Sequence, residues 1–168
     1  MLERADEFNR IVGEELKAQP ALPITRPDKG RNTIPRAGRC DHEQGRLFTG
    51  RYTSIELIEC KDVKIVGAIA ERITADDSEV IIENSRISGA AIALSATRSD
   101  ILATNVTMSA ETPISASRSH LDLAGVKLLG TRTAVASDDR SVFIFSICQA
   151  ESPDHTGLLH GTRHGNAK

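Results

Sequence analysis

The sequence predicts an all-β fold, a parallel β-helix solenoid of about five coils. The first observation is a repeat, because coils counted from Glu56, Ser78, Ser99, Ser119 and Ser141 are 20 to 22 residues long. Self-similarity at such a period is the mark of a solenoid. The second observation is that apolar and polar residues alternate within each coil, which is typical of strands with one buried face. The third is a small polar or glycine residue that recurs between two alternating runs, at Asp62, Asn84, Asn105 and Gly125.

Each coil contains three short alternating runs, and we expect one inward pair from each run. The pairs from the first run are Ile58 and Cys60, Val80 and Ile82, Ile101 and Ala103, Leu121 and Leu123, and Phe143 and Phe145. Those from the second run are Val63 and Ile65, Ser85 and Ile87, Val106 and Met108, and Val126 and Leu128. Those from the third run are Ile73 and Ala75, Ile92 and Leu94, Ile114 and Ala116, and Val135 with Ser137. The recurring turn residues tolerate a left-handed backbone, so they should stack as a ladder with about 4.8 Å per step.

The coil length, the ladder and the strand–turn–strand rhythm resemble the right-handed β-helix, or pectin-lyase-like, superfamily. The resemblance covers roughly residues 50–150. The strict six-residue repeat of left-handed hexapeptide β-helices is missing, which favours right-handed winding. The resemblance implies the fold and leaves the activity open, because that superfamily holds lyases, hydrolases, esterases, phage tail proteins and non-catalytic scaffolds.

Different patterns flank the β-helix, which we assign to residues 51–150. In residues 1–17, Leu2, Phe8, Val12 and Leu16 recur at helical spacing, which predicts an amphipathic helix that either caps the first coil or docks on another chain. Residues 18–50 contain four prolines and an excess of basic side chains, so they are interpreted as an arm: either a solvated connector or a contact for a polyanion or an acidic partner. Residues 151–168 form a tail whose Leu158–Leu159 pair should fold over the last coil.

Composition limits the function classes. The net charge of −2 argues against a nucleic-acid-binding protein, and no apolar run is long enough to span a membrane. No apolar leader opens the sequence, so we expect a cytoplasmic protein, unless the chain is a fragment of a larger one. The three cysteines, Cys40, Cys60 and Cys148, suggest no disulfide framework, and their odd count favours a reducing compartment. Cys60 takes an inward position as a small apolar residue.

Catalytic residues, metal ligands and cofactors are not predicted. The acidic pairs Asp76–Asp77 and Asp138–Asp139 lie three coils apart, or about 14 Å. Paired glycosidase carboxylates need roughly 5 to 9.5 Å. The potential ligands His155, His160 and His164, with Cys40, Asp41 and His42, match no defined zinc spacing.

One surface feature suggests binding. Arg98, Arg118 and Arg140 each precede a serine at the same bend of three successive coils. Their side chains should emerge about 4.8 Å apart. They either fan out into solvent or form a stripe that binds an anion, such as an acidic glycan or an acidic partner surface.

The function predicted from these features is a non-catalytic structural or interaction module that binds a protein partner or forms a homo-oligomer. The helix with Leu2, Phe8, Val12 and Leu16 is one candidate contact, and the exposed ends of the solenoid are another. The alternative is a carbohydrate-binding or carbohydrate-active protein of the polyuronate type.

Overall fold

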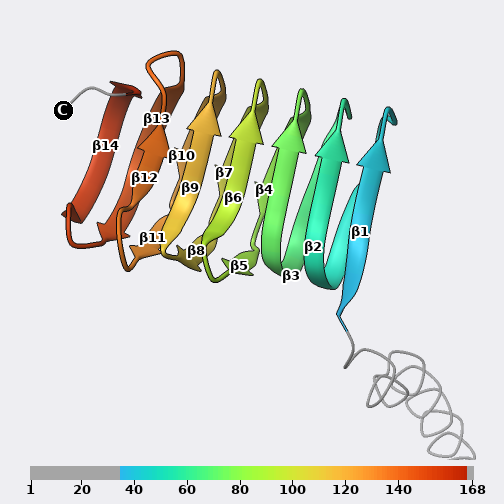
Figure 1. Ribbon diagram of the computed structural model, residues 1–168, viewed down its shortest axis with the longest axis horizontal. Helices are drawn as coiled ribbons and strands as arrows, with labels where there is room; N and C mark the ends of the chain where they lie inside the picture. The colour runs from blue at the N-terminus through green and yellow to red at the C-terminus, as the bar shows by residue number, and fades with distance from the viewer. Residues whose placement is uncertain (1–34, 166–168) are drawn as a thin grey trace, which may run out of the picture. The chain divides into compact units, whose positions relative to one another are not determined.

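The computed structural model describes residues 35–165 and shows a parallel β-solenoid of about six turns (Figure 1). Strands on the near side of Figure 1 rise while the chain advances from right to left, so the winding is right-handed. No helix occurs within residues 35–165, and so none there is long and apolar enough to cross a membrane. The strands are β1 (Arg36–Asp41), β2 (Leu47–Ile58), β3 (Val63–Asp76), β4 (Glu79–Glu83), β5 (Arg86–Ser88), β6 (Ile92–Thr97), β7 (Asp100–Thr104), β8 (Thr107–Ala110), β9 (Thr112–Ser117), β10 (His120–Ala124), β11 (Lys127–Gly130), β12 (Val135–Ser137), β13 (Val142–Glu151) and β14 (Thr156–His164).

The strands of successive turns stack on three sides of the solenoid. One side contains β12, β9, β6 and β3, the next contains β4, β7, β10 and β13, and the third contains β11, β8 and β5. The long strands β2, β3 and β13 bend round corners and belong to more than one side. The register is in phase from turn to turn, so that Val80, Ile101, Leu121 and Phe143 form one column. A residue type that fits a column in one turn therefore fits it in the next.

The interior is built from the inward positions that alternation predicts. Ile82, Leu123, Met108 and Ile114 are all fully buried. The first expected pair is corrected, because Ile55 and Leu57 point inward whereas Ile58 is only half-buried. The left-handed residue Glu59 (φ 50°) interrupts the alternation between the end of β2 and the next inward residue, Cys60. Val63 and Ile65, expected in the second run, instead pair with Val80 and Ile82 of the first run, because Val63 and Val80 are 17 residues apart whereas Val80 and Ile101 are 21 apart. Ile92, Val135 and Ser137 are likewise half-buried rather than fully inward.

The predicted ladder is confirmed for Asn84, Asn105 and Gly125, whose backbones are left-handed with φ between 49° and 61°. Its first member is corrected: because Val66 pairs with Glu83 and Ile69 with Arg86, the residue beside Asn84 on the preceding turn is Gly67 (φ 60°) and not Asp62. Nδ2 of Asn105 donates a hydrogen bond of 2.8 Å to Oδ1 of Asn84. The column continues to Ile147 (φ 53°), an unusual conformation for a β-branched residue.

The solenoid extends beyond residues 51–150 at both ends. β1 and the first residues of β2 lie in the range assigned to the arm, which accounts for six turns rather than five. At the other end, β14 pairs antiparallel with β13, and Leu159 is buried over the last turn as expected. Leu158 faces solvent, with 73% of its surface exposed, because neighbouring residues of a strand point to opposite sides. The predicted helix, with Leu2, Phe8, Val12 and Leu16, lies outside the described residues.

Candidate functional site

The three arginines of the expected stripe lie at one corner of the solenoid, and all three are exposed. Arg98 and Arg118 occupy the same place on consecutive turns, both with left-handed backbones (φ 48° and 52°). Arg140 lies in the turn before β13 and does not share this conformation. The Arg98 guanidinium forms an ion pair with Asp76 (Nη2–Oδ1 2.6 Å). Of these three arginines, Arg118 and Arg140 therefore present guanidinium groups that form no ion pair among residues 35–165.

The serines that follow these arginines form a buried column inside the same corner. Each hydroxyl accepts a backbone N–H from the preceding turn, as in Ser78 N to Ser99 Oγ and Ser99 N to Ser119 Oγ (both 3.1 Å). Each also acts as a donor, as in Ser99 Oγ to the carbonyl of Thr97 (2.7 Å). Ser78, which follows Asp77, belongs to the same column, and Ser141 ends it. All four of these serines, Ser78, Ser99, Ser119 and Ser141, are buried. The repeated Arg–Ser dipeptide thus has a structural cause, because a serine at this corner satisfies backbone donors that would otherwise be buried without partners.

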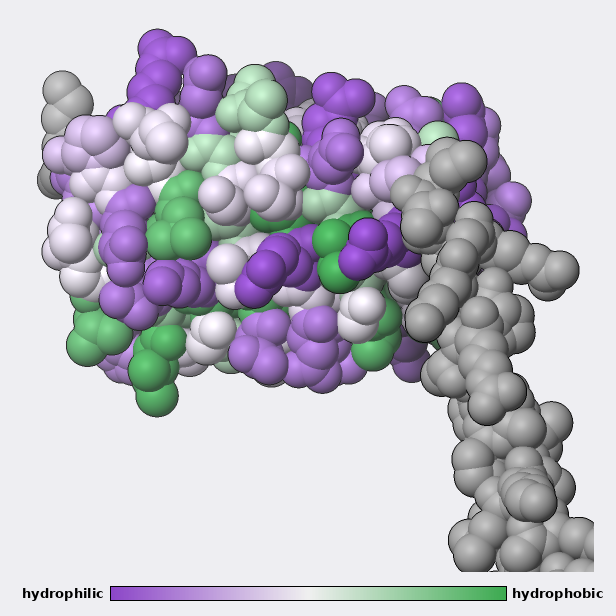
Figure 2. Space-filling view, turned by 90° about the horizontal axis from the view of Figure 1, so that it is seen from below, coloured by the Kyte–Doolittle hydropathy of each residue, from purple (hydrophilic) through white to green (hydrophobic). Residues whose placement is uncertain are grey.

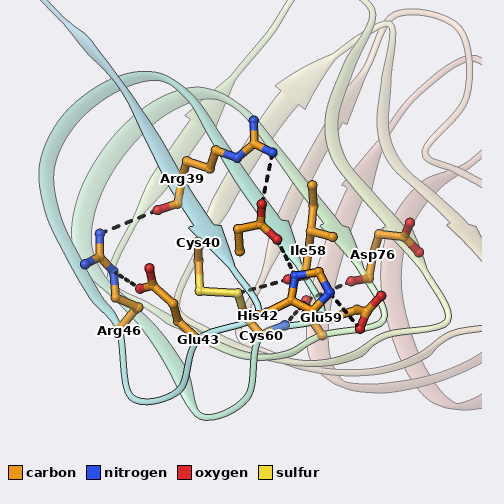
Figure 3. The surroundings of a disulfide bond; sticks show 11 residues. Arg39, Cys40, His42, Glu43, Arg46, Ile58, Glu59, Cys60 and Asp76 are labelled. Carbon is orange, nitrogen blue, oxygen red and sulfur yellow. Dashed lines mark hydrogen bonds and ion pairs between the residues drawn. A yellow bond between two sulfur atoms is a disulfide. The ribbon is translucent and has the colours of Figure 1, made fainter.

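A disulfide replaces the serine at the N-terminal end of this column (Figure 3). Cys40 and Cys60 are bonded, with Cα atoms 6.3 Å apart, and the N–H of Cys60 donates to Ser78 Oγ (2.9 Å). This corrects the expectation of no disulfide, while Cys148 is a buried free thiol. Cys40 pairs in register with Leu57 of the next turn, three residues before Cys60, so the two cysteines lie close together on adjacent turns. The bond also removes the support that the cysteine count lent to a reducing compartment.

Charged side chains surround the disulfide at the surface (Figure 3). Asp41 accepts a hydrogen bond from Arg39 (3.2 Å) and pairs with Nδ1 of His42, while Nε2 of His42 lies 3.1 Å from Glu59 Oε2. The hydrogen bond to Asp41, followed by the charge of Glu59, raises the pKa of His42. The hydrogen bonds from His42 and then Arg39 lower the pKa of Asp41. These exposed pairs tie the first turn to the second at this corner.

Two carboxylates replace missing backbone partners at the C-terminal end. Asp138 accepts hydrogen bonds from the N–H of Arg118 (3.0 Å) and from the hydroxyls of Ser117 and Ser141 (both 2.7 Å). Asp154 accepts from Ala134 N (3.2 Å) and from the hydroxyls of Ser152 and Thr133. The backbone bond from Arg118, then those from Ser141 and Ser117, lower the pKa of Asp138, and the Ser152 and Thr133 hydroxyls lower that of Asp154. Both aspartates act as end caps.

These caps predict a specific dependence of stability on pH. A carboxylate whose pKa is lowered by folding stabilises the protein above its unfolded pKa, near 3.9 for Asp, and loses this effect as pH falls through the folded pKa. We expect Asp138→Asn/Asp154→Asn to unfold at lower urea concentration than the wild type at pH 7. The difference should shrink as pH falls below about 4. The adjacent exposed Asp139→Asn is the control. A difference that stays constant from pH 7 to pH 3 would contradict this assignment.

An acidic depression of about 430 Å³ lies on the side formed by β4, β7 and β10. Glu79, Asp100 and His120 share one row across these strands, and Asp122 lines the depression beside them. His120 Nδ1 lies 3.7 Å from Asp100 Oδ1, and Glu79 pairs with Lys61 (3.4 Å). Glu79, Asp100 and Asp122 lie on three different strands, so no adjacent acidic pair in the sequence points to this depression. These groups are found only by aligning the outward positions of successive coils.

The potential metal ligands weighed in the sequence do not converge among the described residues. Cys40 is bonded to Cys60, and His155 and His164 line a cavity at the other end of the solenoid. Within the part of the chain that the structure describes, no group of three or more His, Cys, Asp or Glu side chains is placed to hold a metal ion.

The outer edge of β1 is the last candidate. The backbone N–H of His42 donates a hydrogen bond to the backbone carbonyl of Ile58 on β2 (2.8 Å). Because alternate residues of a strand direct their backbone groups to opposite neighbours, Ala37, Arg39 and Asp41 direct theirs away from β2. Among residues 35–165, β1 pairs with no strand other than β2.

By architecture residues 35–165 form a parallel β-solenoid: β14 covers its C-terminal turn, and β1 has no outer neighbour among the described strands. No family model, curated protein or solved structure matches the chain.

Proposed function

We propose that this chain is a non-catalytic interaction module that associates with a second copy of itself through the outer edge of β1. The observation that carries the proposal is the difference between the two ends. β14 runs antiparallel over β13 at the C-terminal end, whereas β1 presents outward backbone groups that no described strand accepts. Such an edge is a template for the addition of another strand.

The sequence of β1 is suited to pairing with itself. In a twofold dimer, two identical edge strands run antiparallel. A twofold axis at Cys40 places Arg39 of one copy opposite Asp41 of the other, on residues whose backbone groups point outward. Opposite charges that face each other across strands contribute roughly 0.2–1 kcal/mol per pair. The open edge is thus self-complementary in charge as well as in hydrogen bonding.

Other surfaces support a dimer less well. The face in Figure 2 carries apolar side chains (green) mostly as separate spots among polar ones (purple). Exposed large apolar residues are scattered over the strands, at Leu47, Ile69, Leu102, Ile147 and Leu158. Single exposed apolar residues are ordinary on soluble proteins and indicate no interface. The resemblance of the coils and ladder to the pectin-lyase-like superfamily also supports a non-catalytic scaffold, since that superfamily includes such members.

The test is the mass of the full-length protein in solution, with Ala37→Pro as the variant. Ala37 is exposed, and its N–H points away from β2, so proline removes an outward donor and none of the bonds to β2. We expect the wild type to have twice its chain mass of 18.1 kDa by light scattering. The dissociation constant of the dimer should be about tenfold higher for Ala37→Pro than for the wild type.

Ala37→Ser is the matched control, because it keeps the N–H. A wild type that stays monomeric at all concentrations, or a dimer that Ala37→Pro leaves unchanged, would rule out this edge as the interface.

A carbohydrate-binding or carbohydrate-active protein is the second candidate, and the acidic depression favours it. The carboxylates of Asp100 and Asp122 repel a polyuronate and suit a neutral or basic saccharide. An acidic glycan would instead bind at the corner of Arg118 and Arg140. We expect no turnover of polyuronates, with or without calcium. Release of reducing sugar that is abolished by Asp100→Asn or Asp122→Asn would replace the first candidate with this one.

A further inference from the structure

A cavity of about 660 Å³ opens at the C-terminal end of the solenoid, between β12 and β14. Its origin lies in the way the chain ends. β14 covers β13 in place of a further turn, whereas β12 pairs only with β9 and has no neighbour on its other side among the described residues. The interior of the last turn is therefore accessible between these two strands.

The floor of this cavity is apolar. Phe143 and Phe145 lie on its inner side with their rings stacked, 5.8 Å between centroids and 6° between planes. Leu159 of β14 adds an aliphatic wall, and Ala134 with Val135 of β12 forms the opposite one. Gly161, opposite Phe145 on β14, contributes no side chain to fill the space. Aromatic and aliphatic surfaces of this kind are typical of small-molecule sites.

Polar groups stand at the two ends of the floor. At one end, His155 lines the cavity, and its Nε2 atom is buried without a hydrogen-bond partner among the described residues. At the other end are Arg163 and His164. Arg163 lies on the same face of β14 as Leu159, because the two are four residues apart on one strand. Arg163 has no ion pair within residues 35–165, in contrast to Arg39, Arg46 and Arg98.

The separation of these ends determines the shape of a ligand. His155 and Arg163 are eight residues apart, or up to about 27 Å along an extended strand, less the inward reach of both side chains. A ligand that contacts both residues at once is therefore elongated along β14. A buried nitrogen without a partner normally requires one, since leaving it unpaired costs about 1–3 kcal/mol. A flexible apolar chain with a polar group at each end satisfies both observations.

We propose that this cavity binds an elongated apolar monocarboxylate with a hydroxyl group at its far end, the chemical class of the ω-hydroxy fatty acids. The carboxylate binds Arg163, with His164 beside it, and the chain lies over Phe143, Phe145 and Leu159. The terminal hydroxyl hydrogen-bonds to Nε2 of His155, which accepts or donates according to its tautomer. This site is independent of the β1 edge.

Calorimetric titration of the full-length protein with three soluble probes tests each contact separately. The probes are 10-hydroxydecanoate, decanoate, which lacks the hydroxyl, and 1,10-decanediol, which lacks the carboxylate. We expect 10-hydroxydecanoate to bind most tightly, about tenfold or more above either of the others. Arg163→Met should bind 10-hydroxydecanoate only as tightly as the wild type binds 1,10-decanediol. His155→Leu should bind 10-hydroxydecanoate only as tightly as the wild type binds decanoate.

Val135 lines the cavity and shares the inward column of Ile114, so Val135→Phe fills the cavity and should abolish binding of all three probes. Ser88→Phe, at an exposed position on β5, should leave binding unchanged. Thermal unfolding of each variant establishes that it is folded.

No binding of 10-hydroxydecanoate at about 10 mM would overturn the proposal. So would equal affinity for the three probes, which indicates detergent-like adsorption, or binding that survives Val135→Phe.

Discussion

Leu123→Ala is expected to lower the free energy of unfolding by about 2–5 kcal/mol. Leu123 is fully buried in β10, between Ala103 of the preceding turn and Phe145 of the next. Truncation leaves a cavity that a stacked solenoid fills poorly, because the backbones of adjacent turns are held at a fixed spacing by hydrogen bonds. Ile82→Ala, in the equivalent position on β4, should cost a similar amount.

Glu83→Ala is the control for these substitutions, because Glu83 is the exposed neighbour of Ile82. It should change the free energy of unfolding by less than about 0.5 kcal/mol. Urea titration followed by circular dichroism provides the measurement. Equal, small effects at Ile82, Leu123 and Glu83 would show that the inward and outward positions are assigned incorrectly.

Loss of the disulfide between Cys40 and Cys60 is expected to lower the free energy of unfolding by about 3 kcal/mol. The bond closes a loop of about 20 residues, and constraining the unfolded chain over such a length contributes about this amount. The first turn should be affected most, since only β2 holds β1 in place among the described strands. Urea titration of the wild type with and without dithiothreitol measures the effect.

The Cys40→Ala/Cys60→Ala variant is the control, because reductant should not change its stability. Titration of denatured wild type without reductant should find one thiol, that of Cys148. Three thiols in protein purified without reductant, or no response of its stability to reductant, would contradict the presence of this bond.

The repeat made most of the solenoid predictable from sequence. Alternation assigns one buried face to each strand, and the recurrence of Asn84, Asn105 and Gly125 marks a turn that needs a left-handed residue. Strands without bulky apolar residues were harder to recognise. β1 buries only Gly38 and Cys40, and β14 buries only Leu159, so neither strand shows the alternation of large apolar and polar residues.

The site residues were less predictable because they depend on contacts between turns. The arginine repeat drew attention to Arg98, Arg118 and Arg140, whereas the buried partners of the corner are the serines that follow them. Cys40 and Cys60 meet because Cys40 pairs with Leu57 of the next turn, three residues before Cys60, and cysteine counting does not reveal this register. The C-terminal cavity depends on the antiparallel direction of β14, which no sequence period indicates.

Amide hydrogen exchange along β1 tests the proposed association most directly. In the full-length protein, the amides of Cys40 and His42 point toward β2 and should be protected at every protein concentration. The amides of Arg39 and Asp41 point outward and should become protected only as the concentration rises and dimers form. If the outward amides exchange at one rate at all concentrations, whether fast or slow, β1 is not the interface between copies of this chain.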